Sequence, residues 1–196
     1  KEKNALLVIT KNQETEYKRG LAAREKEAAQ IRARLFELRD LGSISFGQAY
    51  DFSLAASKMT GVRPALILAI LMQESSLGIN VGACYLSDIN TGDGVSIKNG
   101  STKPRTMSPT RDVPVFTSFM TKIGRDPFKT PVSCWIPMYS KGSPSGWGGA
   151  MGPSQFIPST WKLFESRIEK ITGASYADPW NPFHAITATA LYLQDL

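Results

Sequence analysis

The chain has 196 residues, 42% hydrophobic and 10% aromatic, enough to bury the core of one domain and carry an appendage. Its net charge of +6 suits a polyanion, but the charges are mixed in sign and no Lys/Arg block alternates with aromatics, which argues against nucleic acid as a partner. No window approaches the roughly 20 apolar residues of a transmembrane segment. The chain begins at Lys1 without a signal-peptide pattern, so we expect a fragment, whose missing targeting signal says little about location.

Residues 1–41 are expected to form a helical arm. They contain no Pro and one Gly, and they are dense in Lys, Arg and Glu. From Tyr17 onward a coiled-coil seam with 3-4 spacing runs through Tyr17, Leu21, Arg24, Ala28, Ile31, Leu35 and Leu38. Two interpretations remain open. The arm is the end of a coiled coil, with a partner or self-association through residues 1–41, or it is a long exposed helix packed on the following domain.

Residues 45–196 predict a mainly α domain with two loop-rich insertions that could line a cleft. Residues 79–107 are rich in Gly, Asn, Asp, Ser and Thr, and residues 125–149 contain several Pro and Gly. No pair of strands is convincing there. The expected helices cover 46–59 with Ser45 as N-cap, Pro64 to near Gly78, Asp112 to Ile123, Ser159 as N-cap to about Thr172, and a last helix with Asn181 as N-cap.

Glu74 is the candidate general acid. It follows the apolar run from Ala65 to Met72, so we expect its carboxyl to be partly desolvated. A desolvated carboxyl keeps its proton to higher pH, as a general acid near neutrality must. The alternative is a helix-end carboxylate that faces water.

A second dense segment, residues 148–161, has the composition of a substrate wall. Its glycines allow close approach of a ligand, the Gln155 amide can bond sugar hydroxyls, and Phe156 offers a flat apolar face. A structural turn with core aromatics is the other interpretation. Together with Glu74, the segment predicts an enzyme that protonates a leaving oxygen.

Other chemistries have little support. A single His, His184, and two Cys make a zinc site or a nucleophile–His pair unlikely. The stretch from Asp88 to Gly94 is similar to a calcium loop, but its Gly is one place late and Asn99 stands at position twelve, so a turn-rich loop is favoured. We expect no metal and no cofactor. No second carboxyl has an apolar setting, since Asp88, Asp93, Asp112 and Asp126 lie in polar stretches.

Three motifs in order resemble the lytic transglycosylases. They are Gln73-Glu74-Ser75-Ser76, the run from Gly149 to Trp161, and the run from Asp178 to Ile186 leading to Ala190-Leu-Tyr-Leu193. The resemblance covers roughly residues 45–196 and is greatest to the membrane-bound B-type murein enzymes of bacteria. It implies a lysozyme-like helical domain with long loop insertions, at 45–196. The segment 1–41 resembles the coiled-coil arms of several cell-wall hydrolases.

The resemblance implies a lyase acting on peptidoglycan. The enzyme would cleave the β-1,4 bond between N-acetylmuramic acid (MurNAc) and N-acetylglucosamine (GlcNAc), leaving 1,6-anhydro-MurNAc without any cofactor. Glu74 matches the single acid that then acts as base, which fits the lack of a second carboxyl. The other matched residues are Ser75 beside it, Met151, Gln155 and Phe156 along the glycan subsites, and Tyr192, which reaches toward the Glu. A muramidase using water and a non-catalytic peptidoglycan-binding scaffold are the alternatives.

Cys84 and Cys134 bracket most of an insertion, residues 81–146, that departs from better-known members of the family. A disulfide between them would close a loop of about 50 residues and stabilise the domain by roughly 4 kcal/mol. It would also fit an extracytoplasmic location, in a bacterial envelope or secreted. Two separate buried thiols are the other interpretation.

Overall fold

A computed structural model describes residues 14–20 and 44–196 of the chain. The chain divides into two compact units, Lys1–Asp40 and Leu41–Leu196. Within the first unit, residues 14–20 are helical. The rest of the predicted coiled-coil seam lies outside the described residues.

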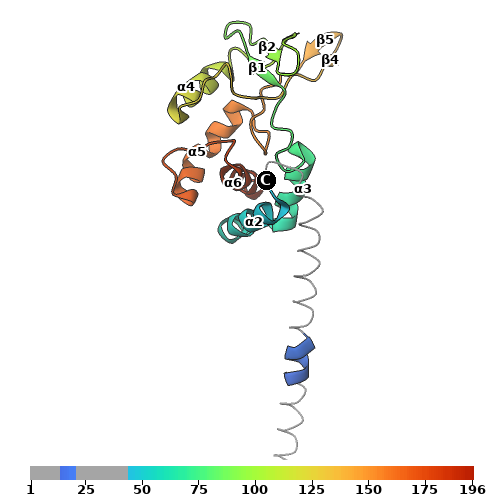
Figure 1. Ribbon diagram of the computed structural model, residues 1–196, viewed down its shortest axis with the longest axis vertical. Coiled ribbons are helices and arrows are strands. Elements are labelled where there is room, and N and C mark those ends of the chain that lie inside the picture. The colour runs from blue at the N-terminus through green and yellow to red at the C-terminus, as the bar shows by residue number, and fades with distance from the viewer. Residues whose placement is uncertain (1–13, 21–43) are drawn as a thin grey trace, which may run out of the picture. The chain divides into compact units, whose positions relative to one another are not determined.

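The second unit is mainly helical, as predicted from the sequence. Its helices are α2 (Phe46–Thr60), α3 (Pro64–Ser75), α4 (Val113–Ile123), α5 (Pro158–Thr172) and α6 (Pro182–Gln194). Figure 1 shows α6 in the middle of the domain, with α2 and α3 on one side and α5 on another. Helix α6 packs against all three, and its residues 184–191 are all buried. The domain is therefore built around α6.

Two hydrophobic clusters meet along α6. Ile186 and Ala190 belong to the cluster under α2 and α3, whereas Ala188 and Leu191 belong to the cluster under α4 and α5. Because successive α-helical residues point in different directions, one apolar helix can serve two cores at once. This accounts for the almost unbroken apolar sequence of α6, which has Thr but no charged residue between His184 and Leu191.

Most helix boundaries follow from capping chemistry. Ser45 accepts a hydrogen bond from the Gln48 N–H while the Gln48 side chain accepts one from the Ser45 N–H, which completes a capping box at the start of α2. The Asn181 side chain accepts from the first N–H groups of α6 in the same way. Both predicted caps are confirmed.

The prediction that Ser159 caps α5 is wrong. The helix begins at Pro158, and Ser159 lies in its first turn. Its N–H donates to Oδ1 of Asp112, at 3.1 Å, so a carboxylate from the start of α4 occupies the position of a cap. A partner 47 residues away leaves no local sequence signal.

The expectation that the domain has no strand pairs is also wrong. Three short antiparallel strands lie in the order β1 (Cys84–Leu86), β2 (Gly94–Ser96) and β3 (Thr102–Lys103). A separate hairpin joins β4 (Met138–Ser140) to β5 (Ser143–Ser145). Strands of two or three residues are too short to show the alternation that identifies a strand in sequence.

The turn of the β4–β5 hairpin has a backbone geometry that suits antiparallel strands. Lys141 and Gly142 form it, with φ of 49° and 79°. Positive φ at both positions is the geometry that matches the twist of two antiparallel strands. Gly142 adopts it freely, whereas Lys141 is in a conformation that few non-glycine residues take.

Cys84 and Cys134 form a disulfide that ties β1 to the segment just before β4. Backbone hydrogen bonds run beside it in both directions between Cys84 and Val132. The two insertions therefore form one strand-rich region, which Figure 1 shows at the end of the domain opposite α2. None of the described helices is long and apolar enough to cross a membrane.

Candidate active site

Glu74 is the penultimate residue of α3, and an unusual turn follows it. Ser76, Leu77 and Gly78 have φ of 51°, 58° and 83°, so three successive residues are left-handed. The N–H groups of Ser76 and Leu77 return to carbonyls of the last helical turn, and the buried Leu77 side chain joins the core under α3. Two non-glycine residues in this region carry strain that the surrounding packing must offset.

Ser75 holds this turn together. Its side chain is 1% exposed, its Oγ donates to the Leu71 carbonyl and accepts from the Gly78 N–H at 2.8 Å, and its own carbonyl accepts from Asn80. The hydroxyl is thus occupied by backbone partners below the surface. Ser75 fixes the backbone that carries Glu74, and its buried hydroxyl proton is already bonded to the Leu71 carbonyl.

The carboxyl of Glu74 is exposed, so the expectation of partial desolvation is wrong. Within the described part of the chain it makes no hydrogen bond and no ion pair. The apolar run gave a wrong expectation because only one side of α3 faces the core. Ile67, Leu71 and Ser75 are buried, whereas Leu66 is 40% exposed. A free carboxyl on a fixed helix end is accessible to a substrate.

The segment 148–156 folds as a tight layer against α6. The Gly149 N–H donates to the Ser133 carbonyl, and the Met151 N–H donates to the Phe156 carbonyl at 3.0 Å. Ser154 donates to the carbonyl of Ala185 in α6 at 2.7 Å. Since α3 also packs on α6, the same helix supports Glu74 and this segment.

The predicted substrate-wall residues are neighbours, with different exposures. Met151 is 1% exposed, and Gln155, at φ 52°, folds back so that its Nε2 donates to the Gly152 carbonyl. The ring of Phe156 lies 5.7 Å from that of Tyr192, which is 42% exposed on α6. Tyr192 also meets the ring of Phe164. The structure therefore gathers these four residues around one turn and one aromatic cluster, with Tyr192 at the surface.

Gly152 is the point at which this layer touches the loop before α6. Its φ is 58°, and a Cβ there would lie 1.9 Å from the carbonyl oxygen of Pro179. We expect Gly152→Ala to lower the free energy of unfolding by about 3 kcal/mol, since backbone strain and overpacking add. Urea unfolding measures this.

Gly173→Ala is the matched control. Gly173 has a similar φ of 71°, but a Cβ there meets nothing within 4 Å. The loss should be about 1 kcal/mol, from the left-handed conformation alone. Equal losses at the two positions would contradict the close approach at Gly152.

Asp112 is a buried carboxyl, although the sequence led us to place it in a polar stretch. It is fully buried, with Oδ2 accepting two bonds from the Arg111 guanidinium and Oδ1 accepting from Ser159. Oδ1 thus links the start of α4 to the start of α5, while Oδ2 is occupied by the neighbouring Arg111. Asp112 is a structural carboxylate, and the prediction of a polar setting is corrected.

His184 has a structural role as well. Its Nδ1 accepts a hydrogen bond from the Asp178 N–H at 2.9 Å. Burial lowers the pKa of His184 below its ordinary value, and the nearby Asp178 carboxylate partly opposes this. A neutral ring that accepts from the backbone holds the loop at the start of α6.

A cavity of about 400 Å³ lies between α4 and α5. Met151 and Trp161 contribute to its wall, and an ion pair of Lys122 with Glu165 stands at its edge. Sequence reasoning missed Glu165 because it lies on an otherwise polar helix face, 43 residues from Lys122. Glu74 lines neither this cavity nor a second one of about 480 Å³ between the ends of α2, α5 and α6.

The stretch from Asp88 to Gly94 is a turn stabilised by its own side chains. Asp88 Oδ1 accepts from the N–H groups of Asn90 and Thr91, which lowers the pKa of Asp88, and Asp93 Oδ1 accepts from Arg105. The interpretation as a turn-rich loop agrees with these bonds. No group of three or more His, Cys, Asp or Glu residues suited to a metal ion occurs in the part of the chain that the structure describes.

Comparison with solved structures identifies the fold of the domain. The domain is similar to a 36 kDa muramidase/transglycosylase, with a TM-score of 0.54 and 22% identity over 76% of this chain and 42% of that chain. It is similar to the Escherichia coli lytic transglycosylase Slt35 in complex with bulgecin A, with a TM-score of 0.53 and 21% identity over 76% and 41%. It is also similar to the soluble lytic transglycosylase SltB1 from Pseudomonas aeruginosa, with a TM-score of 0.53 and 22% identity over 76% and 44%. The domain has a lytic transglycosylase fold.

The likeness is one of structure. A scan of the sequence against protein-family models and a search among curated proteins found no match. The match spans between 41% and 44% of the length of the solved transglycosylases. Within this lytic transglycosylase fold, the Glu74 turn, the 148–156 segment and α6 carry the site residues predicted from the sequence.

Proposed function

We propose that this chain is a peptidoglycan lytic transglycosylase that cleaves the β-1,4 bond between MurNAc and GlcNAc. The observation that carries the proposal is the free, exposed carboxyl of Glu74 on a rigid helix end, in a domain with a lytic transglycosylase fold. A carboxyl without a hydrogen-bond partner in the described part of its own protein can form hydrogen bonds with a substrate. The coincidence of this carboxyl with the fold supports an enzyme over a scaffold.

In the proposed reaction Glu74 acts twice. It first donates its proton to the glycosidic oxygen as the bond from that oxygen to C1 of MurNAc breaks, so GlcNAc leaves with a 4-hydroxyl. The Glu74 carboxylate then takes the proton of the MurNAc 6-hydroxyl while that oxygen bonds to C1. The product is 1,6-anhydro-MurNAc, Glu74 is again protonated, and no water is consumed. Because Glu74 is open to solvent, the bound glycan itself must exclude water from it.

The turn and aromatic cluster beside α6 provide the proposed glycan wall. Tyr192 presents an exposed ring and hydroxyl, and Phe156 lies half-buried behind it. Gln155 keeps its amide oxygen available, since only its Nε2 bonds to the protein in the described residues. Met151 lies beneath them as a buried apolar support.

We further propose an extracytoplasmic, bacterial setting. The Cys84–Cys134 disulfide supports it, because such bonds persist in oxidising compartments. Glycan strands are the proposed partner, and a coiled-coil partner or self-association through residues 1–41 is a separate proposal. The closer likeness to the membrane-bound B-type enzymes remains a proposal as well.

The mass of the released products tests the proposed reaction. Purified peptidoglycan should release muropeptides with 1,6-anhydro ends, each lighter by one water than the hydrolysed form. Products with the mass of the hydrolysed form would identify a muramidase instead. Binding to peptidoglycan without any release would identify a scaffold.

A further inference from the structure

The β4–β5 hairpin exposes apolar side chains on both faces. Met138 and Tyr139 are successive residues of β4, so they point to opposite faces, and they are 59% and 65% exposed. Ile136, just before the strand, is 82% exposed. A hairpin that shows apolar residues on both sides has no face packed on its own domain, and exposed apolar groups that cluster mark interaction sites.

The base of this hairpin is rigid. The disulfide fixes Cys134, and the next residue, Trp135, donates from Nε1 to the Ser145 carbonyl at 2.8 Å across the hairpin. The Trp135 ring also meets that of Tyr139 edge-on, at 6.2 Å between centroids. An isolated two-stranded hairpin is marginal in water, so these ties keep the apolar residues presented to solvent.

The β2–β3 ribbon is fastened to the same base. Arg105, two residues after β3, places its guanidinium 4.1 Å from the centroid of the Trp147 ring and 5.5 Å from that of Trp135. Its Nε donates to the Gly146 carbonyl. Since Trp135 and Trp147 flank the hairpin, both ribbons share one cation–π anchor.

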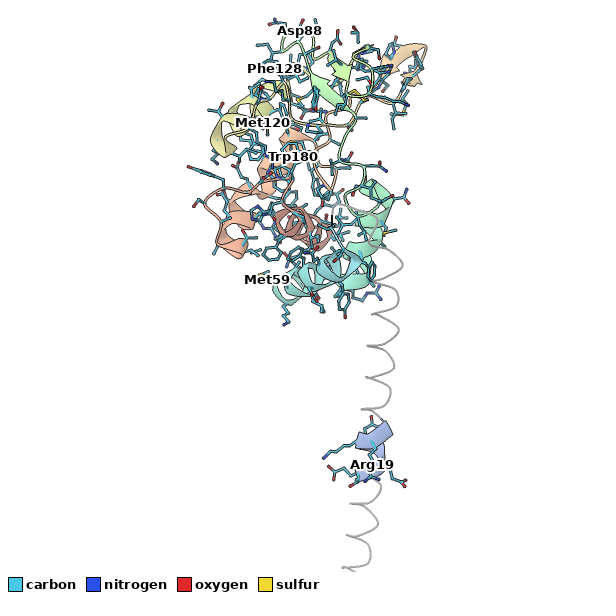
Figure 2. All side chains as sticks on the ribbon, in the orientation of Figure 1. Arg19, Met59, Asp88, Met120, Phe128 and Trp180 are labelled. Atoms are coloured by element: carbon cyan, nitrogen blue, oxygen red, sulfur yellow. A yellow bond between two sulfur atoms is a disulfide. The ribbon has the colours of Figure 1, made fainter. Side chains whose placement is uncertain are left out.

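Each of the two ribbons has an exposed lysine in its turn. Ile97 is 40% exposed beside Lys98 in the β2–β3 turn, and Lys141 is exposed in the β4–β5 turn. Figure 1 shows the ribbons at the same end of the domain, and Figure 2 shows Phe128 there too, with Met59 at the opposite end. We define the strand-end surface as Ile97, Lys98, Phe128, Ile136, Met138, Tyr139 and Lys141.

Two long stretches of the chain around the strand-end surface carry only positive charges. Residues 94–111 and 127–164 contain no Asp and no Glu, while they contain Lys98, Lys103, Lys129 and Lys141 among their basic residues. The acids near this surface are Asp88, Asp93 and Asp126, of which Asp126 accepts from the Phe128 N–H and pairs with Lys129. Apolar side chains beside an excess of basic residues suit a partner that is both apolar and anionic.

We propose that the strand-end surface binds the surface of an anionic lipid membrane. Ile136, Met138 and Tyr139 would enter the boundary between headgroups and acyl chains, while Lys98 and Lys141 meet the lipid phosphates. Three of the five apolar residues of this surface, Ile97, Ile136 and Met138, are aliphatic and offer a sugar neither a hydrogen bond nor a flat ring, so we infer a lipid rather than a glycan partner. This interaction needs no catalysis and would hold the domain at the membrane beside the wall.

Vesicle flotation of the full chain tests the proposal. The chain should float with vesicles of equal parts phosphatidylglycerol and phosphatidylcholine, and stay behind with phosphatidylcholine alone. Serine at Ile136, Met138 and Tyr139 together should weaken binding at least about tenfold, because three apolar side chains are lost from the boundary. Lys98→Gln and Lys141→Gln should each weaken it about five-fold at low salt.

Leu163→Ser is the matched control, because Leu163 is 74% exposed on α5 and outside the strand-end surface. It should leave vesicle binding unchanged, and circular dichroism should show the same helical signal for all variants. The proposal is overturned if the unaltered chain ignores the anionic vesicles or if Leu163→Ser weakens binding as much as the triple variant. A triple variant that keeps vesicle binding but loses binding to purified peptidoglycan would assign the surface to glycan instead. Glu74→Gln should float normally, which separates this proposal from the proposed reaction.

Discussion

Replacing Glu74 by Gln is expected to lower the rate of peptidoglycan release by about a thousandfold, since general acid–base catalysis by one group contributes on the order of 10² to 10⁴. The proposed mechanism uses this carboxyl as acid and then as base, and Gln can do neither. Glu74 is exposed and makes no hydrogen bond within the described residues, so the substitution removes no contact that holds the fold. The release of soluble muropeptides from purified peptidoglycan measures the effect.

Asp51→Asn is the control for this experiment. Asp51 is an exposed carboxyl on α2, so its replacement makes the same chemical change and the same change of net charge. It should leave release unchanged, and both variants should still sediment with peptidoglycan. If Glu74→Gln released muropeptides at the rate of the unaltered chain, the proposed mechanism would be wrong.

Removing the disulfide is expected to have the largest effect on stability. Serine at both Cys84 and Cys134 should lower the free energy of unfolding by about 4 kcal/mol in the chain-entropy model, given a loop this long. The loop spans 50 residues and contains the strands β1 to β3 and α4. Because domains of this kind are stable by only about 5 to 15 kcal/mol, such a loss removes a large share of the total.

Urea unfolding with and without a reductant measures the contribution of the disulfide. The unaltered chain should lose stability in the reductant, while the double serine variant should be insensitive to it. The strand-rich region should also become more susceptible to protease, because both ribbons depend on this tie. An unaltered chain with the same unfolding midpoint under both conditions would contradict the expectation.

The helices could be predicted from sequence because their signals are local. Ser45 and Gln48 form the capping box three residues apart, and Asn181 stands directly before Pro182. The end of α3 was harder, because the helix stops at Ser75 rather than near Gly78. Two left-handed non-glycine residues end it, and no residue preference announces such a conformation.

The strands could not be predicted because tertiary contacts define them. β3 has only two residues, and its pairing with β2 depends on chain held in place by a disulfide and by the Arg105 stack. Local composition identified these stretches as loops, since Gly, Asn and Ser dominate them. Contacts between distant residues gave the loops their shape.

The burial or exposure of the candidate site residues could not be predicted from the sequence, for a similar reason. Glu74 follows an apolar run, but its exposure depends on which side of α3 faces α6. Asp112 lies in a polar stretch, yet Ser159 from a distant segment completes its burial. Periodicity shows that a helix has a buried face, and only packing shows which carboxyl lies on it.

The central position of α6 has a consequence for biosynthesis. The Gln194 side chain donates to the Thr60 carbonyl, a partner 134 residues earlier, and α6 completes both hydrophobic clusters. As the ribosome makes the chain, α2 and α3 emerge long before the helix on which they pack. Their apolar faces stay uncovered until α6 has left the exit tunnel, and pairing over such a distance is slow. We therefore expect these apolar faces to be open to chaperones and proteases until α6 has emerged.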